Sequence, residues 1–126
     1  ARVAPGEGEW SIVEIAAHLA DADEKAIDRI VRMTGEDAPV IEGYDQVELA
    51  ERRRYREMKL SEVLDRFARL RAERVALLEP LDAAGWERTG LHTQVGAITL
   101  LQLTVRMCKH DAIHLAQIAQ AADGRS

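Results

Sequence analysis

Apolar residues recur at steps of three and four along three long segments of this chain, which is the spacing of one face of an α-helix. The first stripe consists of Ile12, Ile15, Leu19, Ala22, Ala26, Ile30 and Met33. Twenty alanines, thirteen leucines and only five aromatic residues among 126 positions also favour helix. No segment shows the sustained alternation of a β-strand. The sequence therefore predicts one all-α domain over residues 1–126.

The helix boundaries are marked by local signals. Ser11 and Glu14 have the spacing of a capping box, so the first helix should begin there, and Gly35 should end it. Thr99 and Gln102 form a second box at the start of the last helix. The other expected segments are a connection over 35–44, a short exposed helix over 45–57, a long helix over 61–79, a non-helical connection over 82–98 and the last helix over 99–122.

The charge balance excludes several functional classes. A net charge of −5 argues against a general nucleic-acid binder, which needs a basic face for phosphates. The basic run 52–54 has acidic neighbours and is interpreted as a solvated face. A single cysteine excludes an intrachain disulfide, and no run approaches the roughly 20 apolar residues of a membrane span. We expect a cytoplasmic protein without a membrane partner.

Three of the four histidines lie within predicted helices. His110 and His114 are four residues apart, so both side chains project from one helix face, which Met107 marks as inward. His18 lies between Ile15 and Ala22 on the apolar side of the first helix. If these helices pack together, three imidazoles converge, and three neutral imidazoles can bind a divalent metal with open positions left. The alternatives are solvent-facing histidines and hydrogen-bonded core histidines.

Four further residues are candidates for a role near these histidines. Gln117 could contact bound water or substrate, or form a hydrogen bond in the core. His92 could line the mouth of the site or lie exposed in its loop. Asp111 could accept a hydrogen bond from a histidine on another helix, or simply solvate its own helix. Cys108 lies about 200° around the helix from His110, so it should point away, and we interpret it as a packing residue.

Several motifs resemble those of one protein family. The segment from Trp10 to Asp23 resembles the opening W-S-x-x-E-x-x-x-H-L-x-D-x-E, with Asp23 at the position of the usual Glu. The most specific match combines positions within residues 86–100 with residues 110–118, which are similar to the ending H-D-x-x-H-L-x-Q-I. Residues 36–45 are similar to a recurrent linker in one branch. The chain resembles the DinB superfamily of DinB/YfiT-like metalloenzymes, and this likeness extends from Trp10 to Gln120.

The resemblance implies a four-helix bundle and a divalent metal (nickel, zinc, iron or manganese) held by His18, His110 and His114. Family members often form homodimers, and some transfer bacillithiol or mycothiol or are named hydrolases. They usually carry another helix before the W-S-x-x-E motif, whereas nine residues precede Trp10. Either that helix lies outside this sequence, or a partner subunit covers the exposed groove.

Two functional hypotheses follow. The first is a metal-dependent enzyme that acts on a small molecule, either by transferring a low-molecular-weight thiol to an electrophile or by hydrolysis. No carboxylate falls clearly on the face of His110 and His114 to serve as a general base, which favours thiol transfer. The alternative is a non-catalytic, metal-binding helical dimerisation module. A metal-free helical interaction protein is a third possibility.

Overall fold

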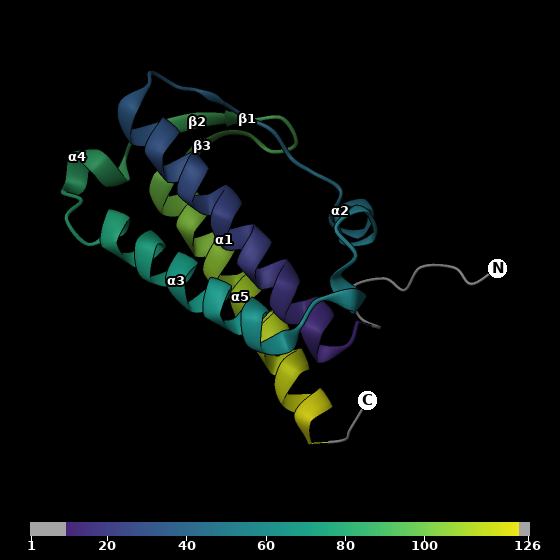
Figure 1. Cartoon of the computed structure of the whole chain (residues 1–126). Helices are drawn as coiled ribbons and strands as arrows, with labels where there is room; N and C mark the ends of the chain where they lie inside the picture. The colour runs from purple at the N-terminus through teal and green to yellow at the C-terminus, as the bar shows by residue number, and fades with distance from the viewer. Residues whose placement is uncertain (1–9, 124–126) are drawn as a thin grey trace.

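The structure is a computed structural model, and it describes residues 10–123. Three long helices lie side by side: α1 (Ile12–Gly35), α3 (Leu60–Leu78) and α5 (Leu100–Ala122) (Figure 1). The connections contain the short helices α2 (Gln46–Arg52) and α4 (Ala83–Trp86) and a 3-10 turn, η2 (Tyr55–Glu57). The prediction of a mainly helical bundle is confirmed. Among the described residues, none of these helices has the length and apolarity to cross a membrane.

Both predicted capping boxes are present. The Ser11 hydroxyl accepts a hydrogen bond from the Glu14 backbone N–H, and the Glu14 carboxylate accepts one from the Ser11 N–H at 3.1 Å. Thr99 and Gln102 make the same reciprocal pair at the start of α5. Each box satisfies backbone donors that the first helical turn leaves unpaired. These ends fix where α1 and α5 begin.

A small three-stranded sheet was not predicted. Strand β1 (Val40–Ile41) runs parallel to β2 (Thr89–His92), which pairs antiparallel with β3 (Gly96–Thr99). The sheet lies at one end of the bundle (Figure 1) and connects the segment after α1 to the segment before α5. It therefore fixes residues 40–44 next to the turn that follows His92.

Gly90 in β2 allows the sheet to pack closely against α1. A Cβ at this position would lie 2.9 Å from Ile41 Cγ1 and 3.4 Å from Met33 side-chain atoms. We therefore expect Gly90→Ala to lower the free energy of unfolding by about 1–3 kcal/mol in urea denaturation. Gly35→Ala is the control, because nothing lies within 4 Å of its Cβ position. Equal stability of the two variants would contradict this packing.

The apolar core is divided into two clusters. One surrounds Trp10, Leu19 and Tyr55, and the other surrounds Met33 and Leu100. The middle of the bundle between them is polar and contains His18, Asp21, Asp23, Arg74, Asp111 and His114, all buried. The helical spacing predicts that Leu60 and Leu64 are buried on one side of α3, but they are 38% and 47% exposed, so this part of the predicted stripe is wrong. Helix α3 therefore packs on α1 through charged side chains as well as apolar ones.

Two ionic clusters join α1 to α3. Asp21 accepts hydrogen bonds from Arg53 at 2.7 Å, from Arg66 at 2.9 Å and from the Tyr55 hydroxyl. Burial, and then the hydrogen bond to Asp21, raise the pKa of Tyr55, so this phenol stays protonated and donates. The second cluster consists of Asp23 on α1, Arg71 and Arg74 on α3 and Asp111 on α5.

Candidate metal centre

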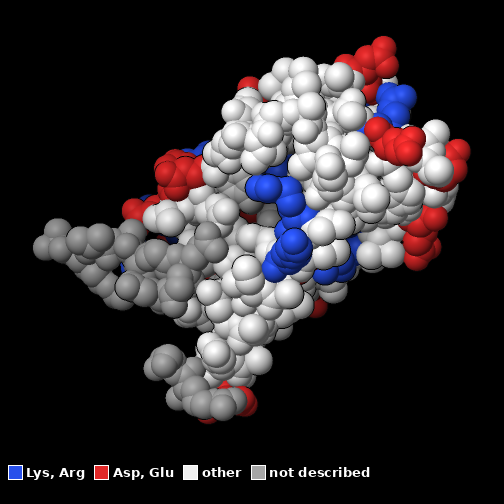
Figure 2. All heavy atoms as spheres, turned by 180° about the vertical axis from the view of Figure 1, so that it is seen from behind, with Lys and Arg blue, Asp and Glu red and all other residues white. Residues whose placement is uncertain are grey.

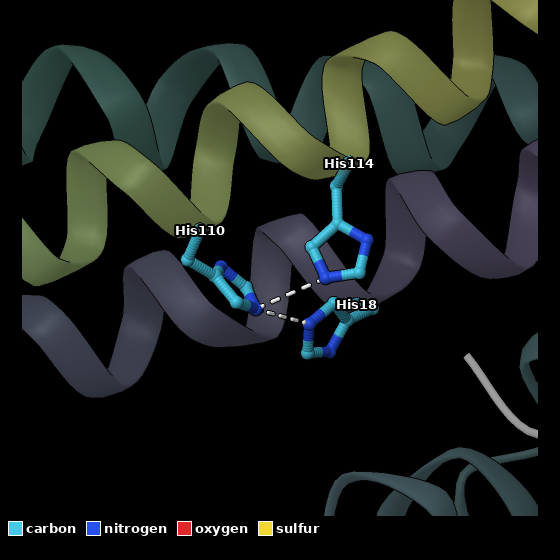
Figure 3. Close-up of side chains that lie close together, drawn as sticks. All are labelled: His18, His110 and His114. Carbon is cyan, nitrogen blue, oxygen red and sulfur yellow. Dashed lines mark hydrogen bonds between the residues drawn. The ribbon is translucent and has the colours of Figure 1, made fainter. Parts of the chain in front are cut away.

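Three histidines meet in the polar middle of the bundle. His18 comes from α1, and His110 and His114 come from successive turns of α5; their ring nitrogens point toward one another (Figure 3). The Nε2 atom of His110 lies 2.8 Å from that of His18 and 3.1 Å from that of His114. His18 and His114 are each 1% exposed, whereas His110 is half-buried. His18 and His114 are thus shielded inside the bundle, and solvent can reach the site beside His110.

The donor arrangement fits a divalent transition metal. Two imidazoles bound to zinc at about 2.0–2.1 Å in tetrahedral geometry place their nitrogens roughly 3.3 Å apart. The separations here are a few tenths of an ångström shorter. One ligand atom from each ring lies within 4.8 Å of the others, and residues 10–123 contain no other such group of three His, Cys, Asp or Glu. Three facing Nε2 atoms need a shared cation or proton, because their lone pairs repel.

His18 has the protonation state that a metal ligand requires. Burial first, and then the neighbouring His110 and His114, lower its pKa to about 3. Its imidazole is therefore neutral near pH 7, which is the form that binds metals. Its Nδ1 is buried and has no hydrogen-bond partner among the described residues.

Gln117 orients His114. The Oε1 atom of Gln117 lies 2.8 Å from His114 Nδ1. An amide oxygen only accepts hydrogen bonds, so Nδ1 carries the proton and Nε2 keeps its lone pair for the centre. The sequence allowed two roles for Gln117, which were contact with bound water or substrate and hydrogen bonding in the core. The structure shows a contact with a histidine that positions its ring.

This contact predicts a graded loss of metal affinity. We expect Gln117→Ala to weaken metal binding roughly 10–100-fold, because His114 loses the partner that fixes its ring and tautomer. Gln117→Glu keeps an acceptor at the same place and should retain most of the affinity. Gln120→Ala, an exposed position on the same helix, is the control. Competition with a chromophoric chelator measures the affinity, and an unchanged value in Gln117→Ala would refute this role.

A cleft of about 490 Å³ opens beside His110. Helix α5 contributes one wall, and α1 with five residues of the connections contributes the rest: Gly43, Tyr44, Gln46, His92 and Gln94. The lining includes four basic side chains, Lys25, Arg29, Arg106 and Lys109, and no Asp or Glu of the described chain. These four residues were not predicted from the sequence. Their spacing was the available signal, since Lys25 lies seven residues after His18 and Arg106 lies four before His110.

His92 lies in the lining of this cleft and is half-buried. The sequence allowed His92 either to line the mouth of the site or to lie exposed in its loop, and the structure places it in the lining. Its Nδ1 accepts a hydrogen bond from the Gln94 backbone N–H at 3.0 Å, so the ring proton sits on Nε2. Burial lowers the pKa of His92, and the positive charges of Arg29 and Arg106 lower it further. The ring is therefore neutral and presents a donor.

Two other predictions change. Asp111 is buried and accepts hydrogen bonds from Arg71 at 3.1 Å and Arg74 at 3.2 Å, so neither the expected contact with a histidine nor solvation is correct. The Asp111 carboxylate pairs with two arginines of α3 because these buried or half-buried positive charges need a negative partner. Cys108 points away from the three histidines as expected, but it is exposed and does not pack in the core.

Comparison with known proteins identifies the family. The model of the DinB superfamily matches residues 1–118. The chain belongs to the DinB superfamily. It is 31% identical over 111 residues to a protein of Oceanobacillus iheyensis named "Putative metal-dependent hydrolase OB0782". That match covers 88% of this chain and 64% of the relative, so the chain spans less than two thirds of its length.

The DinB superfamily assignment agrees with the fold. YfiT from Bacillus subtilis, described as "a probable metal-dependent hydrolase with an unusual four-helix bundle topology", superposes with a TM-score of 0.84 at 25% identity. The match covers 96% of this chain and 71% of YfiT. The predicted family and bundle fold are thereby confirmed. The individual roles of His18, His110 and His114, the homodimer and the cytoplasmic location stay predictions.

Proposed function

We propose that this protein is a metal-dependent enzyme in which His18, His110 and His114 hold one divalent transition metal, and that it transfers a low-molecular-weight thiol to a small electrophile. The observation that carries the proposal is the placement of three converging imidazoles at the side of an open cleft. A site that only stabilises structure is normally closed by four protein ligands. Here the described residues supply three, and one of them faces the cleft.

A bound divalent cation supplies Lewis acidity, which lowers the pKa of a thiol or a water molecule beside the histidines. The protein's own contribution is orientation. Gln117 holds the tautomer of His114, and burial keeps His18 neutral. The cleft beside His110 positions the second substrate. The exposed Cys108 takes no part, so the nucleophilic sulfur is supplied by the substrate.

The lining of the cleft favours thiol transfer over hydrolysis. Hydrolysis benefits from a general base near the attacking water. No carboxylate lies among the described residues of the lining, and His92 presents a proton rather than a lone pair at Nε2. A thiol loses its proton more readily than water and needs no such base. Hydrolysis is the second candidate, because both relatives described above carry that description.

The two reactions can be separated in one assay series. Protein loaded in turn with zinc, nickel, iron(II) or manganese is mixed with an activated aryl halide and a thiol, and in parallel with an activated ester without thiol. We expect conjugation of the thiol that requires metal. The control is His110→Ala, which should lose the activity. Ester hydrolysis without conjugation would establish the second candidate instead.

Absence of both reactions in protein that holds one tightly bound, slowly exchanging metal would favour the non-catalytic dimerisation module. The rate of metal exchange decides this, because a closed structural site exchanges slowly and does not bind thiols. Light scattering on the same samples measures the oligomeric state. A homodimer that falls apart when the metal is removed would identify the module.

A further inference from the structure

We propose that the cleft beside His110 binds an anionic substrate, through an anion subsite formed by Lys25, Arg29, Arg106 and Lys109. This inference rests on the proposed function, because it concerns the substrate of the same centre. The chemical class is a small molecule with a carboxylate or phosphate group. The four basic residues come from two helices that converge on one cleft.

The concentration of positive charge is unusual for this chain. The protein carries a net charge of −5, yet its described cleft lining contains four basic residues and no acidic one. Figure 2 shows basic side chains gathered across the middle of the rear face, while acidic side chains lie toward its margins. Low-dielectric walls focus such a field and raise the local concentration of an anion.

The basic residues of α1, Lys25 and Arg29, contact uncharged groups of the cleft wall and form no ion pair among the described residues. Arg29 donates a hydrogen bond to the backbone oxygen of Glu42 at 2.7 Å. The Lys25 ammonium lies 4.6 Å from the centre of the Tyr44 ring, in a cation–π contact. Within residues 10–123 neither has a carboxylate at ion-pair distance. Neither side chain is therefore occupied by an ion pair within these residues, and both can attract an anionic ligand.

The basic residues of α5 complete the subsite next to the metal centre. Arg106 lies one turn before His110, and Lys109 precedes it directly. Both are exposed, and the described part of the chain offers neither an ion-pair partner. By contrast, Arg53, Arg66, Arg71 and Arg74 all contact carboxylates. His92 adds its Nε2–H to the same lining.

The test compares thiols of similar size and different charge on cobalt-loaded protein. The probes are neutral 2-mercaptoethanol, cationic cysteamine, and the anionic 3-mercaptopropionate and 2-mercaptoethyl phosphate. The charge-transfer absorption band of a cobalt-bound thiolate reports binding directly, so the measurement requires no turnover. We expect an anionic thiol to bind roughly tenfold tighter than the neutral one, because several weak, solvent-screened charge contacts add together. The tighter of the two anionic probes identifies the head group.

Variants remove differences in thiol acidity from the comparison. The ratio of the neutral to the anionic dissociation constant should fall from about ten toward one in the double variant Arg106→Gln with Lys109→Gln, in which Lys25 and Arg29 remain, and to about one in high salt. Arg69→Gln, an exposed position of α3 outside the cleft, should keep the parent ratio. An equal ratio in parent and double variant overturns the anion subsite alone. Failure of every thiol to bind overturns the proposed function as well.

Discussion

Replacing His110 with alanine should reduce the metal content of the purified protein from about one equivalent to almost none, because two imidazoles hold a divalent ion far more weakly than three. His18→Ala should have the same effect, although it lies 92 positions away in the sequence. Elemental analysis of protein prepared without an affinity tag or added metals measures the content. His92→Ala is the matched control, because this half-buried histidine lies in the same cleft but outside the cluster.

Stability provides a second readout of the same prediction. A ligand that binds only the folded state stabilises it by about 4 kcal/mol when its concentration is 1,000 times its dissociation constant. Chelation should therefore lower the unfolding midpoint of the parent protein and leave that of His110→Ala almost unchanged. If parent and variant contain equal metal, the ion is held elsewhere. If the parent takes up no metal on titration, the metal-dependent function is refuted.

The parts of the site that were predictable depend on local signals. The capping boxes at Ser11 and Thr99 fix where two helices begin, and helical spacing then assigns His110 and His114 to one face. The apolar stripe of the first helix places His18 toward the core. That these two faces meet was a hypothesis about packing, and the family motifs supported it. The structure brings the three rings together.

The parts that were not predictable depend on tertiary contacts. Strands β1, β2 and β3 have two to four residues, which is too short for an alternating pattern to be visible. Asp111 was misassigned because charged residues are rarely buried without a partner, and its partners lie on another helix. The basic lining of the cleft was missed because, although the spacing places Lys25 and Arg106 near the histidines along their helices, only the packing of α1, α5 and the connections shows that these charges share one cleft.

Asp23→Ala should lower the free energy of unfolding by roughly 3–5 kcal/mol, because it leaves two arginines of a buried cluster sharing one carboxylate, that of Asp111. The Arg74 side chain is 5% exposed and contacts Asp23 at 2.8 Å. Arg71 contacts the same carboxylate at 2.8 Å, and both arginines also reach Asp111. Burial alone would lower the pKa of Arg71, but Asp23 and Asp111 outweigh it and raise this pKa. The cluster thus joins α1, α3 and α5.

The control for this loss is Glu48→Ala, which removes an exposed pair with Arg52 and should cost less than about 1 kcal/mol. Urea denaturation measures both variants. The double variant Asp23→Leu with Arg74→Met removes one acid and one base, and leaves the contact of Arg71 with Asp111 at 3.1 Å intact. We expect it to recover most of the loss, because apolar side chains of similar size tolerate burial without a counter-charge. A double variant as unstable as Asp23→Ala would show that the bundle requires the ion pairs themselves, and not only charge balance.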